Sequence, residues 1–292
     1  MRLISRHRHS TVSLPRVKMT MAIVQSSFRQ VSTSQDAWSG SVFLWDERGF
    51  YLGAASDTCV HAPHAIKVCI ATHGNFRLHS GIDGSWKSYR AAIVAPDYPH
   101  RLDGRGAMIG LFYLIPEAVE TRRILDGHCK QSISPIAQST IDALLPRLRL
   151  YLDQGCNGEE ASELFDHLVK ELSPSTNSRL ALEPRVSLAL EYLRSTTDHR
   201  ATVTEIAAAV SLSPSRLAHL FRASAGLPIR RYQLWLRLRS AIERMAERGS
   251  LTETAHAAGF ADSAHLSRTF RRMMGLAPSD LLRNSRFIQR ER

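Results

Sequence analysis

Arginine is concentrated in the last third of this chain, where guanidinium groups could bind a polyanion. Residues 179–292 carry 19 Arg, no Lys and 10 acidic residues, so most of the formal net charge of +11 lies there. The stretch AHAAGFADSAHLSRTFRRMMGLAP, residues 255–278, sets arginine, histidine and serine around a sparse apolar face with Leu266 and Phe270. Such an asymmetry is typical of a polyanion binder. A solvated, arginine-rich helical surface is the alternative that charge alone leaves open.

The same pattern occurs about 49 residues earlier, in AAAVSLSPSRLAHLFRASAGLP, residues 207–228. Four pairs of residues match at this spacing: Leu217 with Leu266, Phe221 with Phe270, Arg222 with Arg271, and Gly226 with Gly275. A repeat of this kind indicates that one structural unit is used twice.

Local signals define the elements of each unit. Capping boxes at Thr202-x-x-Glu205 and Ser250-x-x-Glu253 predict two short alanine-rich helices. A turn follows each of them, with Gly259 suited to a left-handed position in the second. Ser213 and Asp262 then N-cap two further helices. A short helix, a tight turn and a second helix make a helix-turn-helix, which is therefore predicted twice.

Residues 229–247 connect the two units and are predicted to form one amphipathic helix, with Trp235, Leu238, Ile242 and Met245 along one side. At about 1.5 Å per residue this helix spans roughly 28 Å. Successive major grooves on one face of DNA lie about 34 Å apart. One rigid helix could thus set two recognition helices into adjacent grooves. The competing hypothesis is a helical interaction module without DNA affinity.

The segment from about Leu182 to Leu282 resembles the DNA-binding domain of AraC/XylS-family transcriptional regulators, above all in AAGFADSAHLSRTFRRMMGLAPSDLLR. Ser211 departs from the pattern, because glycine is more usual at that turn. The resemblance implies that side chains early in each recognition helix read bases, and that those near its end meet phosphate. The predicted base readers are Ser215, Arg216, His219, Ser263, His265, Ser267 and Arg268, and the predicted phosphate contacts are Arg222, Arg271 and Arg272.

Residues from about 40 to 115 are predicted to form strands, because short apolar runs there are bounded by Gly, Pro and Asp. Two helical patterns follow, over residues 136–155 and 159–172. Their leucines either dimerise the protein or seal a small barrel, and the residues in question are Leu144, Leu148, Leu164 and Leu168.

The predicted fold class is α+β: a cupin-like β-barrel plus two helices, then an all-α domain with two helix-turn-helix motifs joined by a linker helix. Residues 1–21 are expected to be a disordered leader, with Met1, Met19 or Met21 as the start. The further expected parts are an effector-binding and dimerisation domain at 22–173, a linker at 174–182, the DNA-binding domain at 183–285 and a basic tail at 286–292.

Histidines of the front domain resemble the cupin arrangement, in which imidazoles converge inside a barrel. His61 and His64 cannot share one face of a strand, which has a period of two, and no Glu follows within reach, so no metal is predicted. The resemblance instead implies a small-molecule effector such as a sugar or an aromatic acid. Arg101 and Arg105 also have the R-x-x-x-R spacing that grips cyclic di-GMP in PilZ-type proteins, although this arginine-rich chain contains that spacing five times. The predicted effector-binding residues are His61, His64, Trp86, Tyr89, His100, Arg101 and Arg105.

Enzyme classes are disfavoured, because GxSxG, P-loop and HExxH motifs are absent, and we predict neither catalytic residues nor a cofactor. The four cysteines lack CxxC spacing and are expected to be buried thiols in a reducing cytoplasm. No apolar run reaches the length of a membrane span, so no membrane association is expected. The sequence thus predicts a cytoplasmic, ligand-responsive transcriptional regulator that binds double-stranded DNA as a homodimer. By family resemblance it would be an activator acting with RNA polymerase, and a repressor is the alternative.

Overall fold

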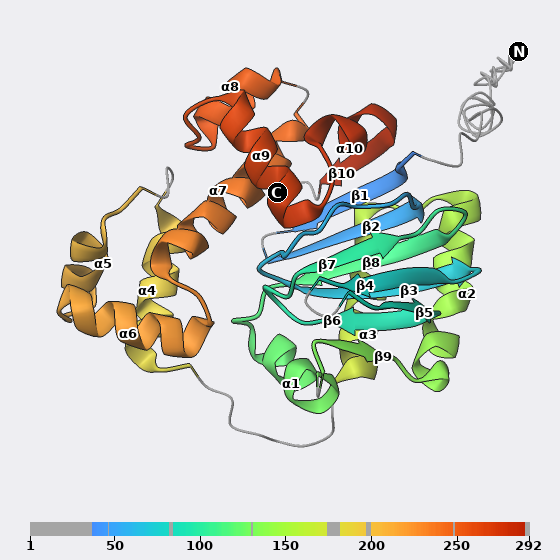
Figure 1. The fold of residues 1–292 in the computed structure, drawn as a ribbon, viewed down its shortest axis with the longest axis horizontal. Helices are drawn as coiled ribbons and strands as arrows, with labels where there is room; N and C mark the ends of the chain where they lie inside the picture. Colours follow the sequence, from blue (N-terminus) through green and yellow to red (C-terminus); the bar gives the residue numbers. More distant parts are fainter. Residues whose placement is uncertain are drawn as a thin grey trace, which may run out of the picture. The chain divides into compact units, whose positions relative to one another are not determined.

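The structure is a computed structural model, which describes residues 37–45, 47–81, 84–129, 131–173, 182–196, 200–247 and 249–289 (Figure 1). The predicted leader, its three candidate start residues and positions 174–181 of the predicted linker lie outside the described residues. We call residues 37–173 the β domain and residues 182–284 the helical domain. Within the described residues, no helix combines the length and apolar character that crossing a membrane requires.

Short apolar segments of the β domain form two sheets. The larger sheet has the order β10-β1-β2-β8-β3-β6-β9, and the smaller has the order β5-β4-β7. The strands of the β domain are β1 (Ser39–Trp45), β2 (Arg48–Ala54), β3 (Ile66–His73), β4 (Phe76–Ser80), β5 (Trp86–Tyr89), β6 (Ala91–Val94), β7 (His100–Asp103), β8 (Met108–Leu114) and β9 (Ile133–Pro135).

Side chains alternate between the two faces of the larger sheet, as the period of a strand requires. In β3, Cys69 and Ala71 pack into a core shared with Phe76 and Leu102 of the smaller sheet. Val68 and Ile70, which alternate with them along the strand, instead belong to the core beneath the helices. Because both faces are covered, β3 is an almost continuous apolar run rather than an alternating one.

Three helices complete the β domain: α1 (Val119–His128), α2 (Gln138–Gln154) and α3 (Gly158–Leu172). The four leucines predicted either to dimerise the protein or to seal the barrel are fully buried against the larger sheet; they are Leu144, Leu148, Leu164 and Leu168. Their burial in this core favours the sealing role, because none of the four side chains is accessible to a partner. Helix α2 runs through Pro146, which is exposed. Helix α1 and strand β9 were not predicted.

The helical domain follows the predicted order closely. Its helices are α4 (Pro184–Ser195), α5 (Val203–Ala209), α6 (Pro214–Ala225), α7 (Ile229–Met245), α8 (Leu251–Ala257), α9 (Ser263–Met274) and α10 (Pro278–Asn284). In Figure 1, α7 runs between the pair α5 and α6 and the pair α8 and α9. The α+β class, with a strand-rich first part and a double helix-turn-helix, is confirmed.

The C-terminal residues differ from the expected basic tail, because Ser285–Gln289 form a strand, β10. It pairs in parallel with β1, with Gly40 opposite Ser285 and Phe43 opposite Ile288. Phe287 and Ile288 pack on opposite faces of the larger sheet, in different cores. These residues form a strand because β1 would otherwise be the edge of the larger sheet, with its backbone N–H and C=O groups unpaired on its outer side.

The cysteines are all free thiols. Cys69 is buried, as predicted, and burial raises its pKa to about 11. The prediction is wrong for Cys59, which is exposed because it lies in an irregular segment between β2 and β3, and Cys129 and Cys156 are only half-buried.

Candidate functional site

The first helix-turn-helix consists of α5, a tight turn and α6. The Thr202 hydroxyl accepts the Glu205 N–H at 3.2 Å, and the Glu205 carboxylate accepts the Thr202 N–H at 2.6 Å, so the predicted capping box is present. Ser213 caps α6 by accepting the Arg216 N–H at 3.3 Å. In the turn, Ser211 has φ +55°, the left-handed region that favours glycine.

The second helix-turn-helix repeats this construction with α8 and α9. Ser250 and Glu253 form its capping box, and the Ser250 N–H and hydroxyl lower the pKa of the Glu253 carboxyl. Gly259 occupies the left-handed turn position at φ +78°. Asp262 caps α9 by accepting the His265 N–H at 2.6 Å. The two motifs therefore begin and turn by the same local chemistry, as predicted.

Each recognition helix is anchored by a narrow apolar edge. Leu217 and Phe221 of α6, and Leu266 and Phe270 of α9, are fully buried in one core. Helix α7 contributes its predicted apolar side to the same core, and Phe221 packs edge-on against Tyr232 at 5.6 Å. This core fixes both recognition helices to α7.

The predicted DNA-contacting side chains lie outside that core. On α6, Ser215, Arg216, His219 and Arg222 are all exposed. On α9 the three arginines are exposed, whereas Ser263, His265 and Ser267 are half-buried. One reason is that the His265 ring packs edge-on against Phe260 at 5.2 Å. Both helices thus present hydroxyl, imidazole and guanidinium groups, which can bind base edges and phosphates.

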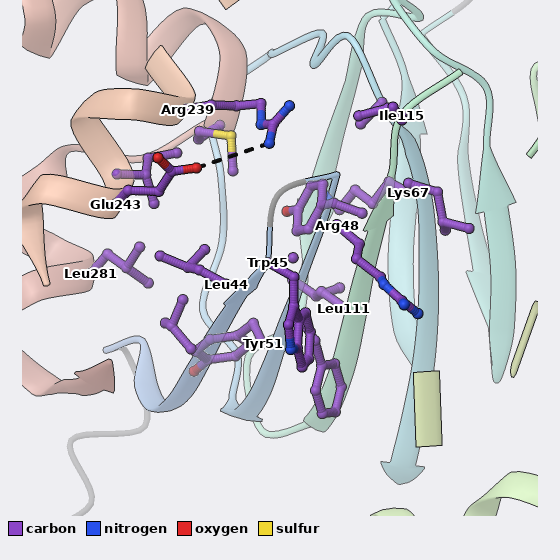
Figure 2. Close-up of a pocket in the computed structure, with 18 of the residues that line it drawn as sticks. Leu44, Trp45, Arg48, Tyr51, Lys67, Leu111, Ile115, Arg239, Glu243 and Leu281 are labelled. Carbon is purple, nitrogen blue, oxygen red and sulfur yellow. Dashed lines mark ion pairs between the residues drawn. The ribbon is translucent and has the colours of Figure 1, made fainter. Parts of the chain in front are cut away.

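An apolar cavity of about 110 Å³ lies between the larger sheet and the helical domain (Figure 2). Figure 2 shows Leu44 and Tyr51 on the sheet side and Leu281 of α10 on the helical side. Sheet residues that line it are Trp38, Val42, Leu44, Tyr51, Lys67, Leu111 and Tyr113, and helical residues that line it are Trp235, Ile242, Phe270, Met274, Leu276 and Leu281.

Lys67 brings a buried cation to the wall of this cavity. Its Nζ donates to His61 Nε2 at 3.2 Å and to His100 Nε2 at 3.3 Å. Both rings carry their proton on Nδ1, which donates to the Cys59 and Tyr98 carbonyls at 2.9 Å. Burial and the neighbouring Lys67 charge lower the pKa of His100 to about 3 and that of His61 well below its usual value. Burial also lowers the pKa of Lys67.

His64, the third predicted histidine, lies apart from this pair and bridges two carboxylates. Its Nδ1 is 2.7 Å from Asp97 Oδ2, and its Nε2 is 2.7 Å from Glu117 Oε1. Burial opposes the charged form, but these two hydrogen bonds raise the pKa of His64 to about 9. The ring also packs edge-on against Tyr232 and Trp235 of α7.

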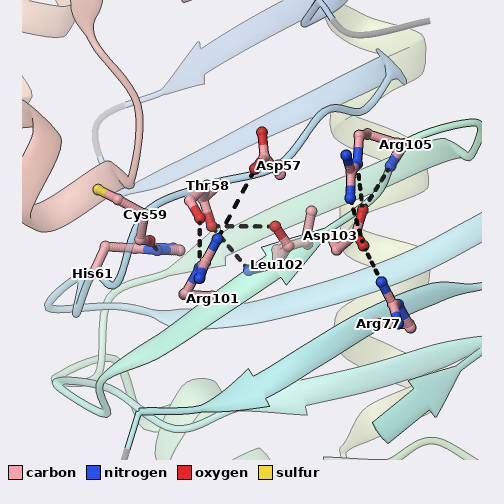
Figure 3. A network of polar contacts seen from close by, with 9 residues as sticks. All are labelled: Asp57, Thr58, Cys59, His61, Arg77, Arg101, Leu102, Asp103 and Arg105. Carbon is pink, nitrogen blue, oxygen red and sulfur yellow. Dashed lines mark hydrogen bonds and ion pairs between the residues drawn. The ribbon is translucent and has the colours of Figure 1, made fainter. Parts of the chain in front are cut away.

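The four remaining predicted effector residues lie on or beside the smaller sheet. Arg101 donates to the Thr58 carbonyl, whereas Arg105 and Arg77 both bind Asp103 (Figure 3). These guanidinium groups lower the pKa of the Asp103 carboxyl. Trp86, 38% exposed, packs with Arg77 and Arg101 on this sheet, and Tyr89 stacks on Phe76. The structure therefore brings together His61 and His100 but separates them from His64, Trp86 and Arg105.

Lys67, Asp97 and Glu117 were not among the residues predicted for the site. Lys67 carried a usable signal, because a single lysine inside the apolar run IKVCIATHG must have either a buried partner or an exit to solvent. The two acidic residues carried none, since they lie 33 and 53 residues from His64. Among the residues that the structure describes, no cluster of three or more His, Cys, Asp or Glu could hold a metal ion.

Comparison with known proteins agrees with this geometry. Residues 206–284 match the family model described as a helix-turn-helix domain. An AraC-like transcription regulator of Streptomyces antibioticus is 32% identical over 99 residues, which cover 34% of this chain and 33% of that protein. The arabinose operon regulatory protein of Escherichia coli K12 is 29% identical over 127 residues, 41% of this chain and 42% of the relative. The matches thus span less than half the length of these two relatives.

Solved structures extend the similarity in fold to most of the chain. ToxT from Vibrio cholerae superimposes with a TM-score of 0.53 at 12% identity, covering 82% of this chain and 98% of that one. A structure of ToxT with a bound unsaturated fatty acid gives a TM-score of 0.52 at 14% identity, covering 85% and 97%. At such low identity the similarity concerns the fold alone.

Proposed function

Because the C-terminal part of this chain is an AraC/XylS-type helix-turn-helix domain, we propose that the protein is a sequence-specific DNA-binding transcriptional regulator controlled by a small molecule. One observation carries the DNA-binding role. Two helix-turn-helix motifs share a core through α7, and each presents polar and basic side chains outside that core on its recognition helix.

The DNA-binding test separates base reading from phosphate binding within α9. Arg268→Ala should weaken binding to a preferred duplex by about 1–3 kcal/mol and relax one base position. Arg272→Ala, the matched control on the same helix, should weaken all duplexes alike and flatten the dependence of affinity on salt. The duplex would be selected from a random pool by the wild-type chain, and affinities measured by fluorescence anisotropy.

Equal losses on selected and random DNA for Arg268→Ala would refute the base-reading role. A helical interaction module without DNA affinity is the competing function, and salt distinguishes the two. Phosphate contacts release counterions, so the affinity of a DNA binder falls steeply as salt rises. A wild-type chain that retains no duplex at low salt would support the interaction module.

For the effector, we propose an apolar molecule with an anionic head group, bound in the cavity between the sheet and the helical domain. The walls are apolar except for Lys67 and a few charged groups, and among the described residues no carboxylate pairs with the Lys67 ammonium. A ligand carboxylate would supply the missing counter-charge. A neighbour of similar fold, ToxT, binds an unsaturated fatty acid, which has this chemistry.

The size of the cavity links ligand binding to the arrangement of the domains. About 110 Å³ holds a short hydrocarbon segment, since a cavity of about 150 Å³ holds benzene. A longer chain has to separate α7 and α10 from the sheet. The orientation of the helical domain would therefore change with occupancy, which is a population shift between two states.

Oleate, a monounsaturated fatty acid, is the probe for this proposal. At 100 times its Kd it should stabilise the chain by about 2.7 kcal/mol, seen as a rise in Tm. Lys67→Met keeps the side-chain length and removes the charge, so it should abolish the shift for oleate. Oleyl alcohol, which lacks the carboxylate, is the matched control ligand and should give little shift with either protein. An unchanged oleate shift in Lys67→Met would refute the pairing.

Cyclic di-GMP, the alternative effector, has less support than an anionic apolar ligand, because Arg101 and Arg105 already bind protein groups. The Arg105 guanidinium is engaged with Asp103, and Arg101 binds the Thr58 carbonyl and lies 4.0 Å from Asp57. A doubly anionic nucleotide would have to replace these contacts. Adding cyclic di-GMP to the same thermal-shift series, with Arg101→Gln as control, tests it directly.

The protein would act in the cytoplasm as a homodimer, and it would activate transcription together with RNA polymerase. The observation that supports this is the family resemblance of the helical domain. Sedimentation of the chain with and without its selected duplex tests the dimer, and transcription in vitro from a template carrying that duplex separates activation from repression.

A further inference from the structure

The β domain binds the backbone of one helix-turn-helix, at the C-terminal turn of α9. The Cys59 N–H donates to the Gly275 carbonyl at 2.8 Å, and the Ala62 N–H donates to the Arg272 carbonyl at 3.2 Å. The Cys59 thiol adds a contact to the Arg271 carbonyl at 3.7 Å. We call the segment 57–62 the docking loop. It satisfies carbonyls that the end of a helix otherwise leaves to water.

Gly275 fits the docking loop so closely that no side chain could replace its hydrogen. A methyl group there would come within 2.5 Å of His61 Nδ1 and 2.7 Å of Thr58 Cβ. The matching residue of the first motif, Gly226, has nearly the same backbone, φ +81° against +84°, but a methyl group there would meet nothing within 4 Å. Gly226 and Gly275 thus have the same backbone conformation, but only Gly275 is packed against the β domain.

Strand β10 adds a second attachment on the same side of the helical domain. It follows α10 directly and forms five register pairs with β1, from Gly40 with Ser285 to Leu44 with Gln289. The first motif has a lighter attachment, in which the Arg122 side chain of α1 donates to the Ser224 carbonyl at 3.0 Å. The β domain therefore binds the second motif through backbone groups and the first through a side chain.

The docking loop also touches the buried cluster at the cavity wall. His61 accepts from Lys67 through Nε2 and donates to the Cys59 carbonyl through Nδ1. The Cys59 N–H in turn holds the Gly275 carbonyl. A group bound at Lys67 would therefore act on α9 through only two intervening residues.

We propose that the β domain regulates DNA binding by docking the C-terminal turn of α9 and β10, and that this docked state must open before the second motif enters its groove. The proposal rests on the DNA-binding function proposed above and assigns its regulation to the second motif. The docking loop binds the main-chain carbonyls of Arg271 and Arg272, whose exposed side chains are the predicted phosphate contacts. If the docked state holds about nine molecules in ten, opening it raises the apparent DNA affinity about tenfold.

The test compares Gly275→Ala with Gly226→Ala in the full chain. Both substitutions place alanine at a left-handed position, so both strain a helix end alike. Only Gly275→Ala clashes with the docking loop. We expect faster amide hydrogen exchange in residues 57–62 and in β1 for Gly275→Ala alone. We also expect a severalfold higher affinity for the selected duplex in that variant, and unchanged or lower affinity in Gly226→Ala.

A chain that ends at Asn284 opens the dock by a second route, because it lacks β10 and leaves Gly275 intact. It should also bind the duplex more tightly than the wild type. The proposal is overturned if the two glycine variants change exchange and affinity alike, or if neither Gly275→Ala nor the shortened chain gains affinity. A wild-type chain that binds no duplex would refute the DNA-binding function and, with it, this regulation, while exchange in residues 57–62 would still report whether the turn is docked.

Discussion

Protonation of His64 should stabilise the contact between the β domain and the helical domain, and raising the pH should remove that stabilisation. Both ring nitrogens face carboxylate oxygens, of Asp97 and Glu117, so both must donate and the ring must be an imidazolium. The network continues to the helical domain through Arg194, which donates to Glu47 and to the Tyr232 hydroxyl. Glu117 is also 3.9 Å from Arg194, so the cluster joins β-domain carboxylates to α4 and α7.

The size of the effect follows from the difference between the two pKa values. A pKa of about 9 in the fold against 6.5 in the unfolded chain corresponds to about 3 kcal/mol. Because the folded pKa is the higher one, the contribution is complete below pH 6.5 and is lost as the pH rises through 9. The free energy of unfolding should thus fall across this interval by up to that amount.

Two measurements check this prediction. An NMR titration of the His64 ring should give a midpoint near pH 9. Urea unfolding at pH 6.5 and pH 9.5 should show the wild type losing stability relative to His64→Gln, which cannot titrate. A midpoint near 6.5, or a difference between wild type and variant that does not change with pH, would refute the reasoning.

Three further predictions concern the turns, the barrel and acid stability. Ser211→Gly should stabilise the chain by about 0.5–1 kcal/mol, because glycine adopts the left-handed conformation without strain, whereas Gly259→Ala should destabilise it by about 1–2 kcal/mol. Urea unfolding measures both changes in unfolding free energy. Changes of the same sign in the two variants would contradict the equivalence of the two turn positions. Leu148→Ala should lower the unfolding free energy by about 2–5 kcal/mol without changing the sedimentation coefficient, since Leu148 is fully buried beneath the sheet. Dissociation of a dimer in this variant would show that the leucine serves an interface instead. His100 stays neutral in the fold, because its pKa is lowered to about 3. The unfolded chain takes up a proton at this residue below pH 6.5, so the free energy of unfolding should fall as the pH drops below that value. His100→Asn should remove that part of the acid sensitivity in the same unfolding assay.

Local signals determined the helical domain, and the sequence alone was therefore enough to predict it. Capping boxes at Thr202 and Ser250 close between residues three apart, and the turn glycine at Gly259 depends on its own backbone angle. The apolar spacing of Leu217 with Phe221, and of Leu266 with Phe270, follows from the period of a helix. Interactions over so few residues do not depend on where the rest of the chain lies, which is why the repeat could be read directly.

Tertiary structure alone decided the surroundings of the sites. His64 binds Asp97 and Glu117, which lie 33 and 53 residues away in the sequence. Gly275 contacts the docking loop, which lies more than 200 residues before it. The cavity has walls from β1 and from α10, and β10 exists because the edge of β1 lies beside it. Such contacts form only when both domains have folded, because no spacing in the sequence encodes which loop will face which helix end. The types of side chain that bind DNA were thus readable from the sequence, whereas the residues that would regulate them became visible only in the folded chain.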